Sequence, residues 1–305
     1  MDLKQIEYFV RVAELGSFTK ASIALDIAQP ALSRQVRQLE IELRQSLLLR
    51  NGRGVTTTEA GRILLEHGRG MLHQMDRVRE ELSRARGGFV GRVAVGLPPS
   101  LSRVLTVPLT RAFRASMPDA VLSITEALSV TMQESIAQGR LDVALLYDAQ
   151  PSPELEIHPL LTQALHLLQS RRHFRDTGPV SLRDVAAQPL ILPSRPNAIR
   201  MRVETELAAL GLHPRIAIEA DAIPAILDLV SDGLGSGILP ASAIHSFGLA
   251  ENFNLRPIVD PPLLTKLSWA VSARRPMTQV QRNLVELIET KVRELVKPDA
   301  SVGAA

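Results

Sequence analysis

Residues 17–43, SFTKASIALDIAQPALSRQVRQLEIEL, predict two helices joined by a tight turn. In the first helix Thr19 can act as the N-cap, with Phe18 and Ile23 packing as a hydrophobic staple around the first turn. The second helix begins at Gln29-Pro30, where proline is tolerated because the first N–H groups of a helix have no intrahelical partner. The stretch therefore favours a helix-turn-helix pair.

The second helix of this pair is amphipathic. At 100° per residue its apolar side chains fall on one stripe and its polar side chains on the opposite face. The stripe comprises Leu32, Val36, Leu39 and Leu43, and the polar face comprises Pro30, Ser33, Arg34, Arg37 and Gln38. In a DNA-binding pair such a helix presents its N-terminal residues to base edges in the major groove. Gln29 suits adenine, Arg34 suits guanine and Ser33 suits phosphate or base, although any solvated amphipathic pair has the same periodicity.

Four further runs occur together in one order: AQPALSRQV at 28–36, LE at 39–40, RNGRGV at 50–55 and TEAG at 58–61. Together they resemble the N-terminal domain of LysR-type transcriptional regulators, closely over about the first sixty residues and more loosely over the whole chain. Two residues depart from the family pattern. Arg44 stands where glycine usually follows the third helix, and Leu48 stands where phenylalanine is usual.

The resemblance implies an α/β protein with three parts. These are an N-terminal winged helix-turn-helix, a long linker helix used for dimerisation, and a C-terminal two-lobed α/β effector domain similar to a type 2 periplasmic binding protein. The implied boundaries are 1–58, 59–87 and 88–305, with lobe I at about 91–161 and 267–297 and lobe II at about 162–266. The implied partners are promoter DNA, RNA polymerase, a second copy of the chain in a dimer or tetramer, and a small effector between the lobes. Activation and repression both remain open.

A β-hairpin is predicted after the second helix of the pair. Two β-compatible runs at 47–49 and 55–57 flank the turn sequence NGRG at 51–54. In the wing that the resemblance implies, Arg53 at the tip would enter the minor groove. The predicted DNA-contacting residues are Thr19, Gln29, Pro30, Ser33, Arg34, Arg37, Arg50 and Arg53.

A long helix is predicted from Thr58 onward. Its apolar residues repeat with alternating spacings of four and three: Leu64, Gly68, Met71, Met75, Val78, Leu82 and Ala85. A heptad seam of this kind predicts a partner helix. We therefore expect Leu64, Met71, Met75, Val78 and Leu82 to form a dimer contact, with packing of the stripe on its own domain as the alternative. A dimer would present two recognition helices to a two-fold DNA site.

Composition and charge limit the class of protein. The 305 residues are 45% hydrophobic and include no cysteine, which excludes disulfides and Cys-ligated metals. No apolar run has the length of a membrane span and no leader peptide is present, so the sequence predicts a cytoplasmic protein without membrane contact. Residues 1–87 hold 14 Lys and Arg against 11 Asp and Glu, whereas the remainder holds 21 of each. The basic excess thus lies with the proposed DNA-binding part.

Beyond the sequence RGG at 86–88, which predicts a linker, short strands and helices alternate. Strands are predicted at 93–96, 121–125, 143–146, 164–168, 190–192, 215–219, 237–239 and 267–273, and helices at about 101–116, 131–138, 197–210, 223–231 and 278–296. Such alternation is typical of a parallel α/β layer. The tail after Pro298 is expected to be disordered.

Three strand ends meet helix starts rich in small polar residues, at 99–102, 129–131 and 194–197. Free N–H groups and the positive end of the helix dipole suit an anionic effector there. Any one of these hydroxyls could equally be a simple N-cap. The candidate effector-binding residues are Ser100, Ser102, Ser129, Thr131, Tyr147, Ser194, Arg195, Asn197, Asp221 and Gly237.

The sequence predicts neither catalysis nor a cofactor. Its histidines lack metal-ligand spacing, and neither a G-x-S-x-G nor a P-loop motif occurs. The glycine-rich run at 233–237 follows a predicted helix and precedes a strand, the wrong order for dinucleotide binding. We therefore predict a non-enzyme without metal. Two alternatives remain: a binding or catalytic α/β domain with N-terminal helices for protein contacts, and a regulator without an effector.

Overall fold

The computed structural model describes residues 1–51, 54–83 and 91–296. Contacts divide the chain into two compact units, residues 1–87 with 138–140 and residues 88–137 with 141–305. They are called here the N-terminal unit and the C-terminal unit. The predicted wing tip at Arg53, the linker at 86–88 and the tail after Pro298 lie outside the described residues.

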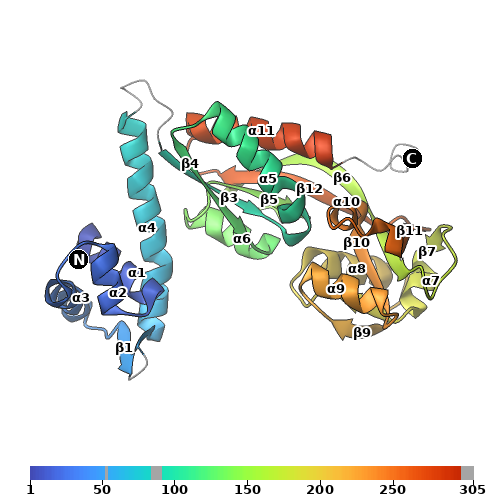
Figure 1. Ribbon diagram of the computed structural model, residues 1–305, viewed down its shortest axis with the longest axis horizontal. Helices are drawn as coiled ribbons and strands as arrows, with labels where there is room; N and C mark the ends of the chain where they lie inside the picture. Colours follow the sequence, from blue (N-terminus) through green and yellow to red (C-terminus); the bar gives the residue numbers. More distant parts are fainter. Residues whose placement is uncertain (52–53, 84–90, 297–305) are drawn as a thin grey trace. The chain divides into compact units, whose positions relative to one another are not determined.

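In the N-terminal unit, helices pack around a small apolar core and are followed by a hairpin and a long helix (Figure 1). The elements are α1 (Leu3–Leu15), α2 (Phe18–Ala24), α3 (Gln29–Leu43), β1 (Leu48–Asn51), β2 (Gly54–Thr57) and α4 (Glu59–Ser83). Leu32 and Leu39 of α3 are fully buried together with Phe9 of α1. The predicted apolar stripe on α3 is therefore confirmed. The hairpin is antiparallel, as predicted, with Leu48 opposite Thr57.

The capping predicted for α2 is wrong. Ser17 is the N-cap, and its Oγ accepts a hydrogen bond from Lys20 N at 3.3 Å. Thr19 lies one residue inside the helix, and Phe18, the first helical residue, is buried. Ile23 is 76% exposed, so the predicted hydrophobic staple does not form. The stretch offers two hydroxyl residues as caps, Ser17 and Thr19 on either side of Phe18, and the burial of Phe18 selects the earlier one.

Arg44 ends α3 in a left-handed backbone conformation, with φ of 53°. Its N–H and that of Gln45 donate to the last carbonyls of the helix, those of Ile41 and Glu40. Glycine is the usual residue at such a position because it has no Cβ to clash. The glycine that the family pattern places here thus has a physical reason, and Arg44 adopts the same turn at a conformational cost.

The apolar stripe of α4 is divided between two uses. Leu64 and Leu72 pack against the core of the N-terminal unit. Gly68 lies against α1, where a Cβ would come within 3.0 Å of Ile6 Cγ2 and 3.1 Å of Val10 Cγ2. Met71 and Val78 are 41% and 47% exposed. Part of the predicted partner seam, including Leu64, therefore packs on its own unit, because α1 covers that side of the helix. The side chains of Leu82 and Ala85 lie outside the described ones.

The C-terminal unit is built on a twisted mixed sheet with helices on both faces (Figure 1). Its strands are β3 (Gly91–Leu97), β4 (Ala120–Glu126), β5 (Val143–Tyr147), β6 (Leu155–Ser170), β7 (Val180–Ser181), β8 (Leu190–Leu192), β9 (Ile216–Glu219), β10 (Ser236–Pro240), β11 (Phe253–Val259) and β12 (Leu264–Ser272). Its helices are α5 (Pro99–Ser116), α6 (Ser129–Ala137), α7 (Leu182–Ala187), α8 (Ala198–Ala209), α9 (Ile223–Ser231), α10 (Ala241–His245), the 3₁₀ turn η2 (Ala250–Asn252) and α11 (Gln279–Leu295).

Two separate groups of buried side chains define two lobes. Lobe I has strands β3, β4, β5 and β12, with α5 and α11 on one face and α6 on the other. Adjacent residues of β3 alternate between these faces: Val95 packs with α5 and α11, and Ala94 packs with α6. Lobe II has its own core over residues 165–263, around β8, β10 and β11. The principal sheet path runs β4-β3-β5-β12-β6-β10-β8-β9.

The prediction of a purely parallel layer is wrong at the centre of the sheet. β12 runs antiparallel to both β5 and β6, and β10 runs antiparallel to β6. The 16-residue strand β6 passes from one lobe into the other, and only its second part, at 164–168, was predicted. β11 also runs antiparallel to β6. The pairings of β3 with β4 and β5, of β8 with β9 and β10, and of β11 with β7 are parallel.

Candidate functional site

The exposed face of α3 is the candidate nucleic-acid interface of the N-terminal unit. Gln29, Pro30, Arg34 and Arg37 are exposed, and Ser33 is half-buried. The N-cap residue of α3 is Ala28, which has no side-chain oxygen to accept from the first-turn N–H groups. Pro30 has no N–H and Ala31 N donates to Ala28 O at 2.9 Å, so at the start of α3 it is chiefly side chains that can contact phosphate and base edges. The side chains of Arg50 and Arg53 lie outside the described ones.

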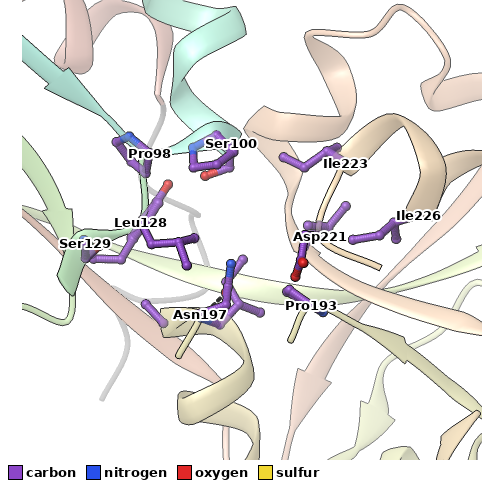
Figure 2. A pocket seen from close by; sticks show the side chains of 14 residues that line it. Pro98, Ser100, Leu128, Ser129, Pro193, Asn197, Asp221, Ile223 and Ile226 are labelled. Carbon is purple, nitrogen blue, oxygen red and sulfur yellow. Dashed lines mark hydrogen bonds between the residues drawn. The ribbon is translucent and has the colours of Figure 1, made fainter. Parts of the chain in front are cut away.

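In the C-terminal unit a cavity that is open to solvent lies between the lobes (Figure 2). Lobe I contributes the starts of α5 and α6, and lobe II contributes the loops after β8 and β9 and the starts of α8 and α9. Five predicted effector residues line it: Ser100, Ser129, Tyr147, Asn197 and Asp221. The rest of the lining is apolar, and no lysine, arginine or histidine belongs to it.

Four helices begin at this cavity, but they do not offer the same donors. Pro99 and Pro224 remove an N–H from the first turns of α5 and α9. In α8, Asn197 Oδ1 accepts from Ile199 N at 2.9 Å. The start of α6 contains no proline, and Ser129, 8% exposed, faces the cavity there. Among the four helix starts, the first-turn N–H groups of α6 are therefore the best hydrogen-bond donors for a bound anion.

Tyr147 connects the cavity to both lobes through hydrogen bonds. Its backbone N–H donates to Ser129 Oγ at 3.0 Å, and its hydroxyl donates to Gln163 Oε1 at 3.0 Å. Gln163 Nε2 in turn donates to Ser242 Oγ of lobe II at 3.2 Å. Burial raises the pKa of Tyr147, while a hydrogen bond from Ser100 lowers it and the charge of Asp148 raises it further. The phenol is therefore neutral at physiological pH.

An ion pair joins the lobes beside the cavity. Arg202 of α8 binds Asp148, which follows β5, with NH2 to Oδ1 at 2.5 Å and Nε to Oδ2 at 3.3 Å. Asp148 also accepts from Thr265 Oγ1 at 2.8 Å and from Lys266 N at 3.1 Å. The hydrogen bond to Asp148 raises the pKa of Arg202. These contacts favour one arrangement of the lobes.

Comparison with known proteins decides the family. A family model described as the LysR substrate binding domain matches residues 86–293, and one described as a bacterial regulatory helix-turn-helix protein of the lysR family matches residues 3–62. The chain belongs to the LysR family. The fold class predicted from the sequence is thereby confirmed, with its N-terminal helix-turn-helix and its C-terminal effector-binding domain.

Relatives with full-length similarity are themselves regulators. The nitrogen assimilation regulatory protein nac of Klebsiella aerogenes is 33% identical over 289 residues, which is 94% of each chain. The transcriptional regulator BenM of Acinetobacter baylyi is 30% identical over 295 residues, 92% of this chain and 93% of BenM. The structure of full-length CbnR with its target DNA has a TM-score of 0.72 at 26% identity, covering 95% of this chain and 100% of CbnR. This LysR protein is accordingly a DNA-binding transcriptional regulator and not an enzyme.

The other five predicted effector residues of the LysR chain lie outside the cavity lining. Ser102 is further along α5, and Thr131 is exposed on α6. Ser194 is close to the cavity, but its backbone N–H is bound to Asp221 Oδ1 at 2.8 Å. Gly237 is buried within β10, where a Cβ would meet Ile226 of α9 at 3.2 Å. Its small size serves the packing of a helix on the sheet.

Arg195 is the clearest correction among these residues. Its side chain is 67% exposed and is bound to Glu204 at 2.9 Å, instead of facing the cavity. Arg200 is buried and is also held by Glu204 and by Glu219. Arg195 and Arg200 are thus neutralised by carboxylates of lobe II.

Sequence reasoning missed the apolar lining and the contacts between the lobes. Leu128, Ile223, Ile226 and Leu239 line the cavity, but their spacing is that of ordinary core residues. Asp148 had one signal in the sequence, its place two residues after the end of the predicted strand at 143–146. Within the described ranges no cluster of three His, Cys, Asp or Glu could hold a metal ion, and no helix is long and apolar enough to cross a membrane.

Proposed function

We propose that this LysR regulator reads promoter DNA with the start of α3. The observation that supports it is the division of α3 into a buried apolar face and an exposed polar face that begins with Gln29, Pro30 and Arg34. Gln29, Pro30, Ser33 and Arg34 would lie in the major groove and Arg53 in the minor groove, with Thr19, Arg37 and Arg50 as further DNA contacts. Arg34 is expected to matter most, because its guanidinium fork matches guanine.

We further propose a small effector whose anionic group is bound at the start of α6. Ser129 Oγ accepts from Tyr147 N, so its hydroxyl proton can be donated to the effector. The first-turn N–H groups of α6 add donors at the positive end of the helix dipole. Since no cationic side chain lines the cavity, these are the groups that favour an anion there.

The effector would act through the arrangement of the lobes. It must bind one arrangement better than the other, because a ligand with equal affinity for both shifts nothing. The changed arrangement would alter how the DNA-binding parts meet a promoter and RNA polymerase in the cytoplasm.

A dimer through α4 completes the proposal. The described exposed apolar residues of α4 are Ile63, Met71 and Val78. Met71 and Val78 belong to the same four-three stripe as Gly68, which contacts α1, but they stay exposed. A second copy would cover them and place two α3 helices on one two-fold site, in a dimer or a tetramer. Residues 1–58, 59–87 and 88–305 would then serve DNA binding, dimerisation and effector binding.

A thermal-shift screen of the full chain tests the effector site. Small carboxylates, aromatic acids, sulfonates and sugar acids are compared, because a ligand at a hundredfold excess over its Kd stabilises the native state by about 2.7 kcal/mol. At least one class is expected to raise the melting temperature. Ser129→Ala should weaken its binding about tenfold or more, whereas Ser116→Ala, at the exposed end of α5, should not. A flat result for every class contradicts the effector site and favours a regulator without an effector.

A further inference from the structure

The polar groups that line the cavity are separated by their role in hydrogen bonding, with donors on one side and acceptors on the other. We propose that the effector is a zwitterion of the amino-acid class, with its carboxylate at the start of α6 and its ammonium group between Asp221 and Ser100. This inference rests on the proposed function, because it needs the same cavity to be the effector site.

Asp221 supplies the negative charge at the acceptor side. Figure 2 shows it across the cavity from Ser129 and Leu128. The hydrogen bond that the described contacts give its carboxylate comes from Ser194 N to Oδ1, which leaves Oδ2 for a ligand. The nearby cations do not neutralise it, since Arg195 and Arg200 are bound to Glu204. A ligand with only negative charge would be repelled here, whereas an ammonium group would be attracted.

Ser100 lies on the acceptor side as well. The Tyr147 hydroxyl donates its proton to Gln163 Oε1, and Gln163 is fixed in this orientation by the donation from its Nε2 to Ser242. Ser100 Oγ therefore receives no proton from Tyr147, and its lone pairs can accept from a ligand. Its 6% exposure means that a ligand group bound there is well shielded from water.

The donor side matches a carboxylate. Ser129 has a proton to donate, and the first turn of α6 has N–H groups without intrahelical acceptors. Asn197, whose Oδ1 is held by Ile199 N, turns its amide nitrogen into the cavity between the two sides (Figure 2). A carboxylate beside α6 can thus accept from lobe I and from lobe II together, which favours a closed arrangement.

The remaining lining limits the side chain of the effector. Leu128, Ile223, Ile226 and Leu239 surround the space between the polar groups. A charged side chain would be buried there without a partner, at a large cost in free energy. Amino acids with small or apolar side chains are therefore the expected members of the class.

Matched ligand pairs test the inference by titration calorimetry on the full chain. The pairs are alanine with propionate, valine with 3-methylbutanoate and leucine with 4-methylpentanoate, which differ only in the ammonium group. Asp221→Asn removes the charge and keeps the oxygen that accepts from Ser194 N. Asp232→Asn is the matched control, because it removes the same charge at the exposed far end of α9.

The inference predicts that at least one amino acid binds the wild type about ten- to a hundredfold tighter than its deaminated partner. Asp221→Asn should abolish this difference and Asp232→Asn should preserve it. If the deaminated acids bind the wild type as tightly as the amino acids do, the ammonium site is wrong while the proposed anion site stands. An amino-acid preference that survives Asp221→Asn also overturns the inference. If no acid or amino acid binds, the inference and the proposed effector site both fail.

Discussion

Arg44 shows how a single backbone angle gives a testable residue-level prediction. Its φ of 53° is costly for any residue with a Cβ and nearly free for glycine. Arg44→Gly should therefore raise the free energy of unfolding of the N-terminal unit by about 0.5–1 kcal/mol. Thermal and urea denaturation of the full chain would measure the change.

Gln38→Gly is the matched control for Arg44→Gly, because Gln38 is exposed in the interior of the same helix. There glycine should destabilise by about 1 kcal/mol. If both variants changed the free energy of unfolding in the same direction, the left-handed conformation at the end of α3 would be contradicted.

Tyr147 gives a prediction that depends on pH. Its pKa is raised by burial above the value of about 10 for an unfolded chain, so the folded state keeps a proton that the unfolded state loses at high pH. The contribution of this proton to stability is complete below about pH 10 and is lost as the pH rises through the folded pKa. The free energy of unfolding of Tyr147→Phe should thus fall less steeply above about pH 10 than that of the wild type.

At neutral pH, Tyr147→Phe should cost about 1–3 kcal/mol, because it leaves the buried Gln163 Oε1 without its donor. Urea denaturation of both proteins from about pH 8 to about pH 11 measures both effects. If the free energy of unfolding fell equally steeply with pH in the two proteins, the raised pKa of Tyr147 would be contradicted.

At residue level the sequence predicted best the cavity residues that stand at helix starts. Ser100, Ser129 and Asn197 stand at helix starts, which local patterns reveal. Arg195 was misplaced because its partner Glu204 is nine residues away, a distance at which sequence periodicity shows no pairing. The apolar lining could not be separated from core, because both have the same spacing.

At the scale of elements, α4 gives a prediction about assembly. Val78 is 47% exposed on the four-three stripe of α4, further along the helix than Gly68, which contacts α1. Val78→Glu should shift the oligomer toward monomer in sedimentation experiments, because the charge would be buried in the partner contact. Val107→Glu on α5, where Val107 is 53% exposed, serves as the control and should leave the oligomer unchanged. An unaltered oligomer for Val78→Glu would contradict a dimer through this face.

The ion pair between Asp148 and Arg202 gives a prediction about the lobes. Both side chains are partly buried, at 13% and 26% exposure. A double-mutant cycle with Asp148→Asn and Arg202→Met should show a coupling of about 1–2 kcal/mol in the free energy of unfolding. The fully exposed pair of Glu59 and Arg62 is the control and should show no measurable coupling. Equal coupling energies in the two pairs would contradict this prediction, because the inter-lobe ion pair would then stabilise the fold no more than an exposed surface pair does.

The elements themselves were predictable where periodicity was strong. Helix α9 and strand β8 were predicted with their observed bounds, and α3 began at the predicted proline. The first half of β6 was missed because Pro159 and the polar residues around it read as a loop. Its pairing with β12 supplies the stability that the local sequence lacks. The antiparallel direction of β12 is likewise set by a partner more than 100 residues away.

At the scale of the whole molecule, the proposed function requires two binding events, of DNA and of an effector, in one chain. If an effector between the lobes changes the affinity for DNA, DNA must change the affinity for the effector by the same factor. This reciprocity follows from linkage alone and needs no assumption about how the two units are placed.

DNA recognition by α3 is the central claim, and one measurement tests it most directly. Binding of the full chain to DNA selected by the wild type from a random pool is compared for wild type, Arg34→Ala and the control Arg111→Ala, an exposed arginine of α5. Arg34→Ala should lose about 1–3 kcal/mol of binding and relax the preference at one base position in each half-site. Arg111→Ala should keep the wild-type affinity and the wild-type base preference. Unchanged affinity and unchanged base preference for Arg34→Ala would contradict the account.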